Sequence, residues 1–354
     1  MPGMMGISRP LLITVVIATL LLFIPSMSIY RNAVWIVKGL REYTKNGYLS
    51  AAENFTPGDL DVDCSGNQYL ITGSNSGIGK QTALEIARRG GTVHMVCRNP
   101  ITAEEARKEI VDETKNDNVH VHILDLSNPK GVHQFATKFV SENQDKGLSV
   151  LVNNAGCMVN TRELTEDGLE KNFATNTLGT YILTESLSPL LLQTSTSTSR
   201  SRVVTVSSGG MLTNKMDPTD LQTENKTFDG TMVYAQNKRQ QIIITEQWAK
   251  KYSSIQFTTM HPGWADTPAV RTSMPDFYEK MKDKLRTTEQ GADTAVWLAV
   301  SESNVATGEK NSGEFYQDRQ VVSKHLPLAW SRSSAADETS LMQQLDAFYQ
   351  KFTG

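Results

Sequence analysis

Short apolar runs alternate with longer amphipathic runs along most of this 354-residue chain, and this alternation limits its fold more than any other feature. The short runs are typical of buried strands, and the longer ones are typical of helices. Strands that alternate with helices form a parallel sheet covered by helices on both faces. The sequence therefore predicts one α/β domain built on a doubly wound parallel sheet.

The boundaries of these runs give a definite set of expected elements. Expected strands are Tyr69–Thr72, Thr92–Cys97, Val119–Leu124, Val150–Val152, Val203–Val206, Ile255–Met260 and Gly313–Tyr316. Expected helices are Ile78–Arg89, Ala103–Thr114, one that opens at Pro129, Tyr234–Lys251 and Thr287–Val300, and the stretch Leu164–Leu192 is expected to be mostly helix. The polar stretch from Leu212 to Met232 is expected to be a long loop over the site. Ligands of such sheets bind beyond the carboxyl ends of the strands, so the residues after each strand are the candidates.

A glycine-rich turn follows the first expected strand and opens the first expected helix. Its residues are Thr72, Gly73, Ser74, Asn75, Ser76, Gly77, Ile78 and Gly79. Glycines let the backbone approach a phosphate, and the N-terminus of a helix offers N–H groups and a positive dipole end. The turn therefore predicts a Rossmann-like site for the pyrophosphate of a dinucleotide, although its spacing is GxxxGxG rather than GxGxxG.

Charged residues follow the second and third expected strands, and the first of them indicates which dinucleotide binds. Arg98 follows the second strand, where an acidic residue would bind the ribose 2′-hydroxyl of NAD and an arginine suits the 2′-phosphate of NADP. The sequence therefore predicts NADP(H). Asp125 ends the third strand and either accepts from the adenine amino group or caps the next helix together with Ser127.

Small and polar residues follow the later strands. Those after the fourth strand could pack against the adenosine side of the cofactor, and a hydroxyl after the fifth could hydrogen-bond a substrate carbonyl. A Pro-Gly turn after the sixth could face the nicotinamide. These residues are Asn154, Ala155 and Gly156, then Ser207 or Ser208, then Pro262 and Gly263.

Tyr234 and Lys238 stand four residues apart on an expected helix, so both groups can face one site. A nearby ammonium favours the phenolate and lowers a tyrosine pKa from its ordinary value of about 10. Tyr234 is therefore a candidate general acid or base.

The motifs TGSNSGIG, NNAG, VSS, YxxxK and PGxxxT occur in this order and resemble those of the short-chain dehydrogenase/reductase superfamily over residues 65–320. The resemblance implies a catalytic tetrad of Asn176, Ser208, Tyr234 and Lys238. In it, Asn176 would hold a water of a proton relay and Ser208 would orient the substrate. Tyr234 would be the acid/base, and Lys238 would bind the nicotinamide ribose hydroxyls. The resemblance also gives Thr267 a contact with the carboxamide.

Composition excludes several other classes of function. The net charge is −3 with 39% hydrophobic and 21% charged residues, a globular balance with no sign of nucleic-acid binding. The three cysteines form no CxxC pair and the histidines form no HExxH motif, so we expect no metal site.

The ends of the chain differ from the expected catalytic domain over residues 65–320. Leu11–Ile24 is almost purely apolar and is either a membrane anchor, the core of a signal peptide or neither, and Met27 is an alternative start. Residues 27–64 form an amphipathic segment, which could lie at a membrane interface or pack on the domain. Residues 321–354 form a C-terminal extension with a helix. We expect membrane association, for example with the endoplasmic reticulum, if residues 1–26 are retained, and a cytoplasmic protein otherwise.

Two functional hypotheses follow. The first is an oxidoreductase that transfers a hydride between NADP(H) and a lipophilic carbonyl or alcohol substrate. The second is a catalytically idle NADP-binding scaffold or sensor. The complete tetrad favours the first. The resemblance also permits a homo-oligomer.

Overall fold

The computed structural model describes residues 29–196, 199–302 and 311–354, and its centre is a single eight-stranded sheet. The strand order is β3-β2-β1-β4-β5-β6-β7-β8. All neighbouring strands from β3 to β7 pair in parallel, and β8 pairs antiparallel with β7. The chain starts near the middle of the sheet and adds strands outward in both directions. This is the doubly wound arrangement predicted from the sequence, which is thereby confirmed.

The strands lie within two residues of their predicted positions at each end, apart from β8, which has no predicted counterpart. The strands are β1 Gln68–Thr72, β2 Thr92–Cys97, β3 Val119–Ile123, β4 Val150–Asn153, β5 Arg202–Val206, β6 Gln256–Met260, β7 Phe315–Gln317 and β8 Gln320–Val321. The short apolar runs predict these strands well because most of them are buried on both faces and so carry few polar residues.

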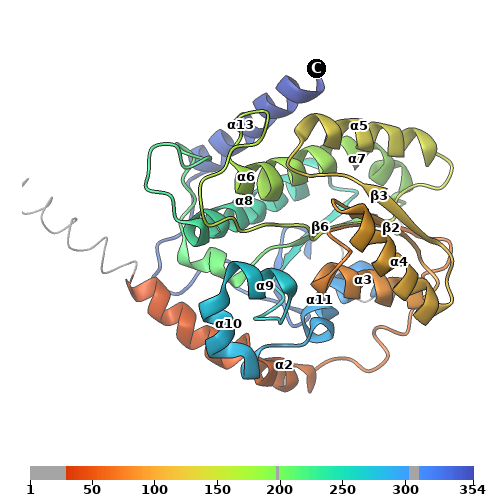
Figure 1. Ribbon diagram of the computed structural model, residues 1–354, viewed down its shortest axis with the longest axis horizontal. Coiled ribbons are helices and arrows are strands. Elements are labelled where there is room, and N and C mark those ends of the chain that lie inside the picture. The colour runs from red at the N-terminus through yellow and green to blue at the C-terminus, as the bar shows by residue number, and fades with distance from the viewer. Residues whose placement is uncertain (1–28, 197–198, 303–310) are drawn as a thin grey trace, which may run out of the picture.

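The helices surround this sheet (Figure 1). A helix over residues 29–42 comes first. The others are α2 Lys45–Ala52, α3 Gly77–Arg88, α4 Pro100–Thr114, α5 Pro129–Glu142, α6 Lys171–Phe173, α7 Thr180–Thr194, α8 Gly230–Lys251, α9 Pro268–Ser273, α10 Pro275–Met281, α11 Thr288–Val300 and α13 Ala335–Thr353. A π-helical turn, Ala174–Gly179, joins α6 to α7, and short 3-10 turns span Gly209–Thr213 and Lys282–Lys284.

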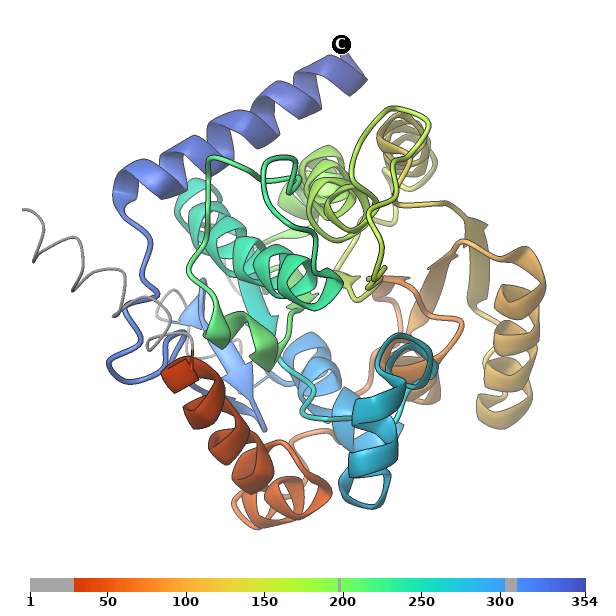
Figure 2. The ribbon, with the colours of Figure 1, turned by 60° about the vertical axis from the view of Figure 1, so that its left-hand side comes forward.

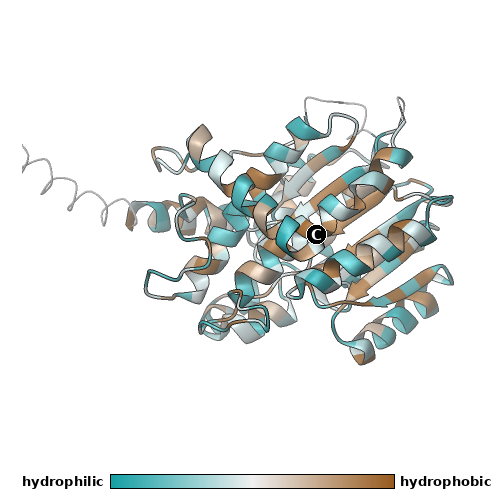
Figure 3. Cartoon of the chain, turned by 90° about the horizontal axis from the view of Figure 1, so that it is seen from above, coloured by the Kyte–Doolittle hydropathy of each residue, from teal (hydrophilic) through white to brown (hydrophobic). Residues whose placement is uncertain are grey.

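The sheet separates two apolar layers. Helices α3, α4 and α11 cover one face, and α5, α7 and α8 cover the other (Figure 1). The side chains of β1 alternate between them, because Tyr69 and Ile71 pack towards α3 whereas Leu70 packs towards α5 and α7. Coloured by hydropathy, the strands form a hydrophobic band between helices with hydrophilic outer faces (Figure 3). The packing of these strands fixes the positions of their carboxyl ends, where the candidate site residues lie.

Acidic side chains set the start of two helical stretches, at positions that differ from the expected boundaries. The predicted helix Leu164–Leu192 begins only at Lys171, since the buried Glu170 carboxylate accepts from the N–H groups of Asn172 and Phe173 at 2.9 and 2.7 Å. The predicted loop over 212–232 opens with a 3-10 turn. It ends where Asp229 caps α8 by accepting from the Met232 N–H at 3.0 Å.

Both extensions pack on the domain, with helix 29–42 and helix α13 well apart on its surface (Figure 2). Helix α13 buries Leu341 and Leu345 in the layer of α5, α7 and α8. Helix 29–42 lies beside the segment that follows β8, where the Tyr30 hydroxyl donates to the Pro327 carbonyl at 2.9 Å. The apolar run Leu11–Ile24 and the start at Met27 lie outside the described residues. Among the residues that are described, no helix has the length and apolar character needed to span a bilayer.

Candidate active site

A cavity of about 780 Å³ opens beyond the carboxyl ends of β1, β2, β4, β5 and β6. Most of the residues that the sequence predicts for the site line this one cavity. They are Gly73, Asn75, Ser76, Gly77, Ile78, Arg98, Asp125, Asn154, Ala155, Gly156, Ser208, Tyr234, Lys238, Pro262, Gly263 and Thr267. Four predicted residues lie outside the lining, namely Thr72, Ser74, Gly79 and Asn176.

Three of these four hold the glycine-rich turn against its neighbours instead of facing the cavity. The Thr72 hydroxyl accepts from the N–H groups of Asn154 and Ala155 at 3.0 and 2.9 Å. The buried Ser74 hydroxyl donates to the Ile71 carbonyl at 3.0 Å. Gly79 lies so close to the loop after β4 that a Cβ there would come within 2.3 Å of the Asn154 amide nitrogen.

The glycine-rich turn forms a cradle that fits a pyrophosphate. Gly73 and Gly77 adopt φ values of +64° and +54°, a region that favours glycine. The N-terminus of α3 lies at the cavity wall, and its N-cap Ser76 makes no side-chain hydrogen bond to the helix. The backbone N–H groups of the first turn and the positive end of the helix dipole are therefore available to an anion.

Arg98 and Asp125 line the cavity where β2 and β3 end. Arg98 is exposed, and no ion pair joins it to any described residue. Asp125 accepts from the Ser127 N–H at 2.9 Å, but the N-cap of α5 is Asn128, which accepts from Gly131 N–H at 2.9 Å. The capping alternative for Asp125 is therefore wrong.

Asn154 lines the cavity and also braces the glycine-rich turn. Its side-chain amide donates to the carbonyls of Thr72 and Gly73 at 2.9 and 3.1 Å. Both contacts tie the loop after β4 to the cradle. The residue thus shapes the cavity wall through β1, and its amide hydrogens are not directed to a ligand.

Helix α8 brings Tyr234 and Lys238 to the same wall of the cavity, one helical turn apart. The Lys238 ammonium lies 5.4 Å from the centre of the Tyr234 ring and donates to the Val206 carbonyl at 2.8 Å. The Ser208 hydroxyl lines the same cavity and lies near enough to the phenol to lower its pKa slightly. The neighbouring Ser207 donates instead to the Lys238 backbone carbonyl at 3.0 Å, so the geometry favours Ser208 as the hydroxyl that faces a ligand.

Burial dominates the protonation of this pair. It raises the pKa of Tyr234 to about 12, and the nearby Ser208 hydroxyl offsets only part of that shift. Burial also lowers the pKa of Lys238 to about 8. The lowered tyrosine pKa expected from the sequence is therefore not found. The ammonium is directed at the Val206 carbonyl, and desolvation of the phenol outweighs its influence.

Asn176 lies directly behind this wall, in the π-helical turn between α6 and α7. Its side-chain amide accepts from the Cys157 N–H and donates to the Cys157 carbonyl, both at 2.8 Å. A Cβ on Gly156 would lie 3.2 Å from the Asn176 Oδ1 and 3.5 Å from the Lys238 Nζ. Asn176 and Lys238 thus both lie next to Gly156. The π-helical turn that carries Asn176 is a feature frequently found at functional sites.

A buried ion pair that sequence reasoning missed supports the Pro262–Gly263 turn. Arg286 binds Asp318 through two hydrogen bonds of 2.6 and 2.9 Å and also donates to the Glu42 carbonyl at 2.7 Å. Gly263, with φ of +75°, packs against the guanidinium, where a Cβ would come within 2.2 Å of Arg286 Nε. In the sequence, only the Pro-Gly pair of the PGxxxT motif indicates that another group approaches Gly263 closely. Arg286 and Asp318 are too far away in sequence to be recognised as its neighbours.

The remaining wall of the cavity is largely apolar and aromatic. Trp264 makes edge-to-face contacts with Trp35 of helix 29–42 and with Phe277 of α10, at ring distances of 5.6 and 5.3 Å. Met274 completes this wall. Met211 and Leu212 are buried in a separate apolar cluster.

Thr267 lies at the start of α9, where its hydroxyl accepts from the Val270 N–H at 3.3 Å. No group of three or more potential metal ligands occurs in the part of the chain that the structure describes.

Comparison with known proteins gives consistent matches. The sequence model of the family described as short chain dehydrogenase matches residues 67–276. Human dehydrogenase/reductase SDR family member 12 is 57% identical over 326 residues, which cover 92% of this chain and all of that protein. Bovine retinol dehydrogenase 12 is 36% identical over 73% of this chain and 79% of that protein.

Among solved structures, an uncharacterized protein from Mycobacterium paratuberculosis matches 82% of this chain and 97% of its own, with a TM-score of 0.64 and 27% identity. A short chain dehydrogenase from Escherichia coli, complexed with NADPH, matches 73% of this chain and 99% of its own, with a TM-score of 0.56 and 21% identity. The second likeness concerns the fold alone.

Proposed function

Because this chain belongs to the short-chain dehydrogenase/reductase family and is therefore an NAD(P)-dependent oxidoreductase, we propose that it transfers a hydride between NADP(H) and a lipophilic carbonyl or alcohol. One observation carries this proposal. The Ser208 hydroxyl, the Tyr234 phenol and the Lys238 ammonium line the cavity that also holds the dinucleotide cradle. A proton donor is therefore adjacent to the place where a nicotinamide would lie.

The residues of the nucleotide end support NADP(H) as the cofactor. Gly73 and Gly77, with the N-terminus of α3, would hold the pyrophosphate, and Asp125 and Ala155 would flank the adenosine. The exposed Arg98 guanidinium would pair with the 2′-phosphate that distinguishes NADP from NAD. When bound, this cofactor supplies or accepts the hydride.

The catalytic end supports acid–base chemistry at a carbonyl oxygen. In reduction, the Ser208 hydroxyl would hydrogen-bond that oxygen and the Tyr234 phenol would give it a proton as the carbonyl carbon gains the hydride. A phenol with a raised pKa is fully protonated at neutral pH, as an acid must be. Lys238 would bind the nicotinamide ribose hydroxyls, and Asn176 would hold a water through which Tyr234 regains its proton.

The apolar wall supports a lipophilic substrate. Trp35, Trp264, Met274 and Phe277 offer aromatic and thioether surface, with few groups that could bind a sugar or a charged metabolite. Several relatives with about 35% identity are retinol dehydrogenases by name. A long apolar alcohol or aldehyde therefore suits this wall.

We further propose that residues 65–320 form the catalytic domain, which the segments 27–64 and 321–354 complete. The first of these segments contributes Asn32 and Trp35 to the cavity wall. The proposed membrane association through residues 1–26 and the proposed homo-oligomer rest on sequence alone.

The test is a screen of carbonyl compounds with the full chain and NADPH, following carbonyl-dependent loss of NADPH absorbance. The panel should contain long-chain aldehydes, retinal-like polyenals and steroid ketones, with sugars and 2-oxo acids as matched polar carbonyls. We expect turnover of apolar members and little turnover of polar ones. Tight NADPH binding with no turnover of any member would favour the idle scaffold or sensor.

A further inference from the structure

Helix 29–42 exposes an apolar stripe to solvent. The exposed hydrophobic residues of this helix recur every three or four positions and so lie on one side of it. They are Ile29, Ala33, Ile36, Val37 and Leu40. Val37 is 68% exposed. The opposite side of the helix faces the domain, where Gly39 lies against Trp264 and Trp35 lines the active-site cavity. The helix is thus apolar on both sides, and the domain covers only one of them.

A second segment, almost 300 residues away in sequence, extends this apolar surface. In the stretch after β8, Leu328 is 77% and Trp330 is 72% exposed, and both have positive φ, near +50°. Arg31 Nε donates to the Ala329 carbonyl at 2.7 Å, so this stretch is fixed beside the start of helix 29–42. We call the stripe together with Leu328 and Trp330 the outer apolar face. Large exposed apolar patches on a folded domain mark interaction surfaces.

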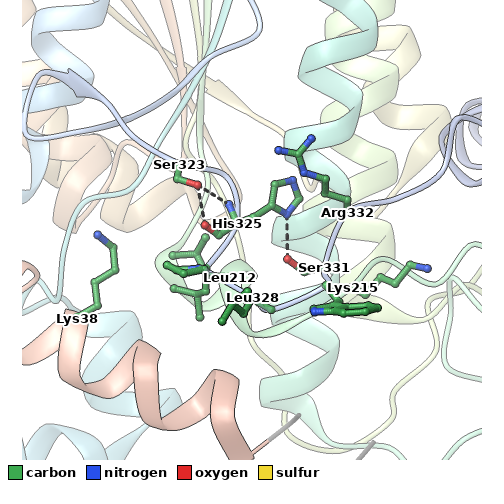
Figure 4. Close-up of a pocket in the computed structure, with 12 residues that line it drawn as sticks. Lys38, Leu212, Lys215, Ser323, His325, Leu328, Ser331 and Arg332 are labelled. Carbon is green, nitrogen blue, oxygen red and sulfur yellow. Dashed lines mark hydrogen bonds between the residues drawn. The ribbon is translucent and has the colours of Figure 1, made fainter. Parts of the chain in front are cut away.

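Basic side chains border the outer apolar face. Between helix 29–42 and the stretch after β8 lies a cavity of about 780 Å³ whose lining includes Lys38, Lys215 and Arg332. Figure 4 shows Lys38 and Lys215 at opposite sides of this cavity, with Leu212 and Leu328 between them. Helix 29–42 carries three basic side chains and one acidic side chain, although the whole chain has a net charge of −3. Glu42 pairs with both Lys38 and Arg41, so the helix keeps a local excess of two positive charges.

We propose that the outer apolar face docks on a membrane surface that contains anionic lipids. An apolar stripe flanked by cations is the pattern of a helix that lies in the plane of a bilayer interface, and tryptophan is enriched at that depth. The chain that precedes residue 29 adds a second indication, since its sequence from Leu11 to Ile24 is apolar. A second copy of this chain is a poorer occupant, because a symmetric contact would bring the same cations together.

Docking in this way sets the orientation of the active site. Asn32 and Trp35 belong to the docked helix and also line the catalytic cavity. The mouth of the cavity therefore lies next to the lipid surface, where lipophilic molecules concentrate. The docking itself does not depend on the reaction that we propose for the site.

The experiment places a polarity-sensitive fluorophore on cysteines introduced into the full chain and adds vesicles with quencher-bearing lipids. Val37→Cys and Leu328→Cys report on the outer apolar face. Ile101→Cys on α4 is the matched control, because Ile101 is 69% exposed and does not belong to that face. Cys64 and Cys97 are buried and Cys157 is half-buried, so the unsubstituted chain, labelled in parallel, gives the background.

On vesicles of phosphatidylcholine and phosphatidylserine, we expect a blue shift and severalfold quenching at positions 37 and 328, with neither at position 101. An additional Leu328→Asp substitution should reduce the quenching at position 37, whereas Ile101→Asp should not. Equal quenching on phosphatidylcholine alone would overturn the requirement for anionic lipid.

Three results would overturn the docking proposal. The first is unquenched labels at 37 and 328 in a chain that still pellets with the vesicles, which would leave only its N-terminal sequence as the attachment. The second is equal quenching at all three positions, which means unspecific adsorption. The third is a blue shift at 37 and 328 that needs no vesicles and grows with protein concentration, which means self-association.

Discussion

The two halves of the active-site cavity are built in different ways. The nucleotide half is made of neighbouring strand ends, and its shape depends on glycines, backbone groups and short side chains such as Thr72 and Asn154. The substrate half depends on parts that are remote in sequence. There the Pro262–Gly263 turn is supported by Arg286 and Asp318, while helix 29–42 supplies Trp35.

This difference means that damage to the two halves should have different consequences. A change in the nucleotide half should alter cofactor binding and leave the domain folded, because it acts on surface loops at the strand ends. A change in the buried supports of the substrate half should reduce stability. Those supports are charged groups buried away from solvent, and the loss of one partner leaves the other charge uncompensated.

The largest expected effect follows from removing one partner of the buried ion pair. Asp318→Ala leaves the Arg286 guanidinium, which is 1% exposed, without its carboxylate. We expect the free energy of unfolding to fall by about 3–5 kcal/mol in urea titrations. The control is Asp266→Ala, which breaks a more exposed pair with Arg271 and should cost no more than about 1 kcal/mol. Equal losses in the two variants would contradict the role given to the buried pair.

The next effect concerns the choice of cofactor. Arg98→Asp should weaken NADPH binding by about 10–100-fold, since a charge-assisted hydrogen bond contributes about 1.5–3 kcal/mol, and should improve binding of NADH. Titration of intrinsic fluorescence with each cofactor measures both affinities. Arg107→Asp is the control, because Arg107 lies on α4 outside the cavity and pairs with Glu104. An unchanged ratio of the two affinities in Arg98→Asp would rule out its contact with the 2′-phosphate.

A smaller effect is expected from filling the space at Gly79. The new Cβ in Gly79→Ala would push against the Asn154 amide and the Gly73 carbonyl, and such overpacking costs about 1–3 kcal/mol. NADPH affinity should therefore fall by about 5–100-fold as the cradle shifts. Gly131→Ala in α5 meets only the Asn128 side chain, which lies outside the cavity, and should leave the affinity unchanged. Normal affinity in Gly79→Ala would mean that the cradle tolerates movement.

The smallest effect is a pH dependence of cofactor binding. Burial lowers the pKa of Lys238 to about 8, so its ammonium is present below pH 8 and is lost as the pH rises through that value. If the ammonium binds the ribose hydroxyls, NADPH affinity should fall by a few-fold between pH 7 and pH 9. The affinity of Lys238→Met should be lower throughout and show no such step. A step of the same size in that variant would assign the titration to another group.

The same division separates what the sequence predicts from what it does not. The strands and the glycine-rich turn follow from local patterns, because most strands are buried on both faces and most of the expected nucleotide-binding positions follow directly after a strand. Tyr234 and Lys238 lie on the same face of α8 because residues four apart in a helix are about one turn apart. Such short-range relations can be inferred from one sequence.

The substrate half depends on contacts with no local pattern. Arg286, Asp318 and the carbonyl of Glu42 meet only after three distant segments have folded together. The pKa of Tyr234 was misjudged for a related reason. The i, i+4 spacing with Lys238 is visible in the sequence, but the burial of the phenol and the contact of the ammonium with the Val206 carbonyl are properties of the packed structure.

The most direct test of the central assignment is Tyr234→Phe in the full chain, measured for both NADPH affinity and carbonyl-dependent NADPH oxidation. The substitution removes only the phenol oxygen, so the cradle and the Lys238 contact with Val206 should persist and the affinity should change little. Loss of a positioned general acid costs about 10²–10⁴-fold in rate, and we expect a loss of that size in kcat. A variant that retains the kcat of the unsubstituted protein would contradict the assignment of Tyr234 as the acid.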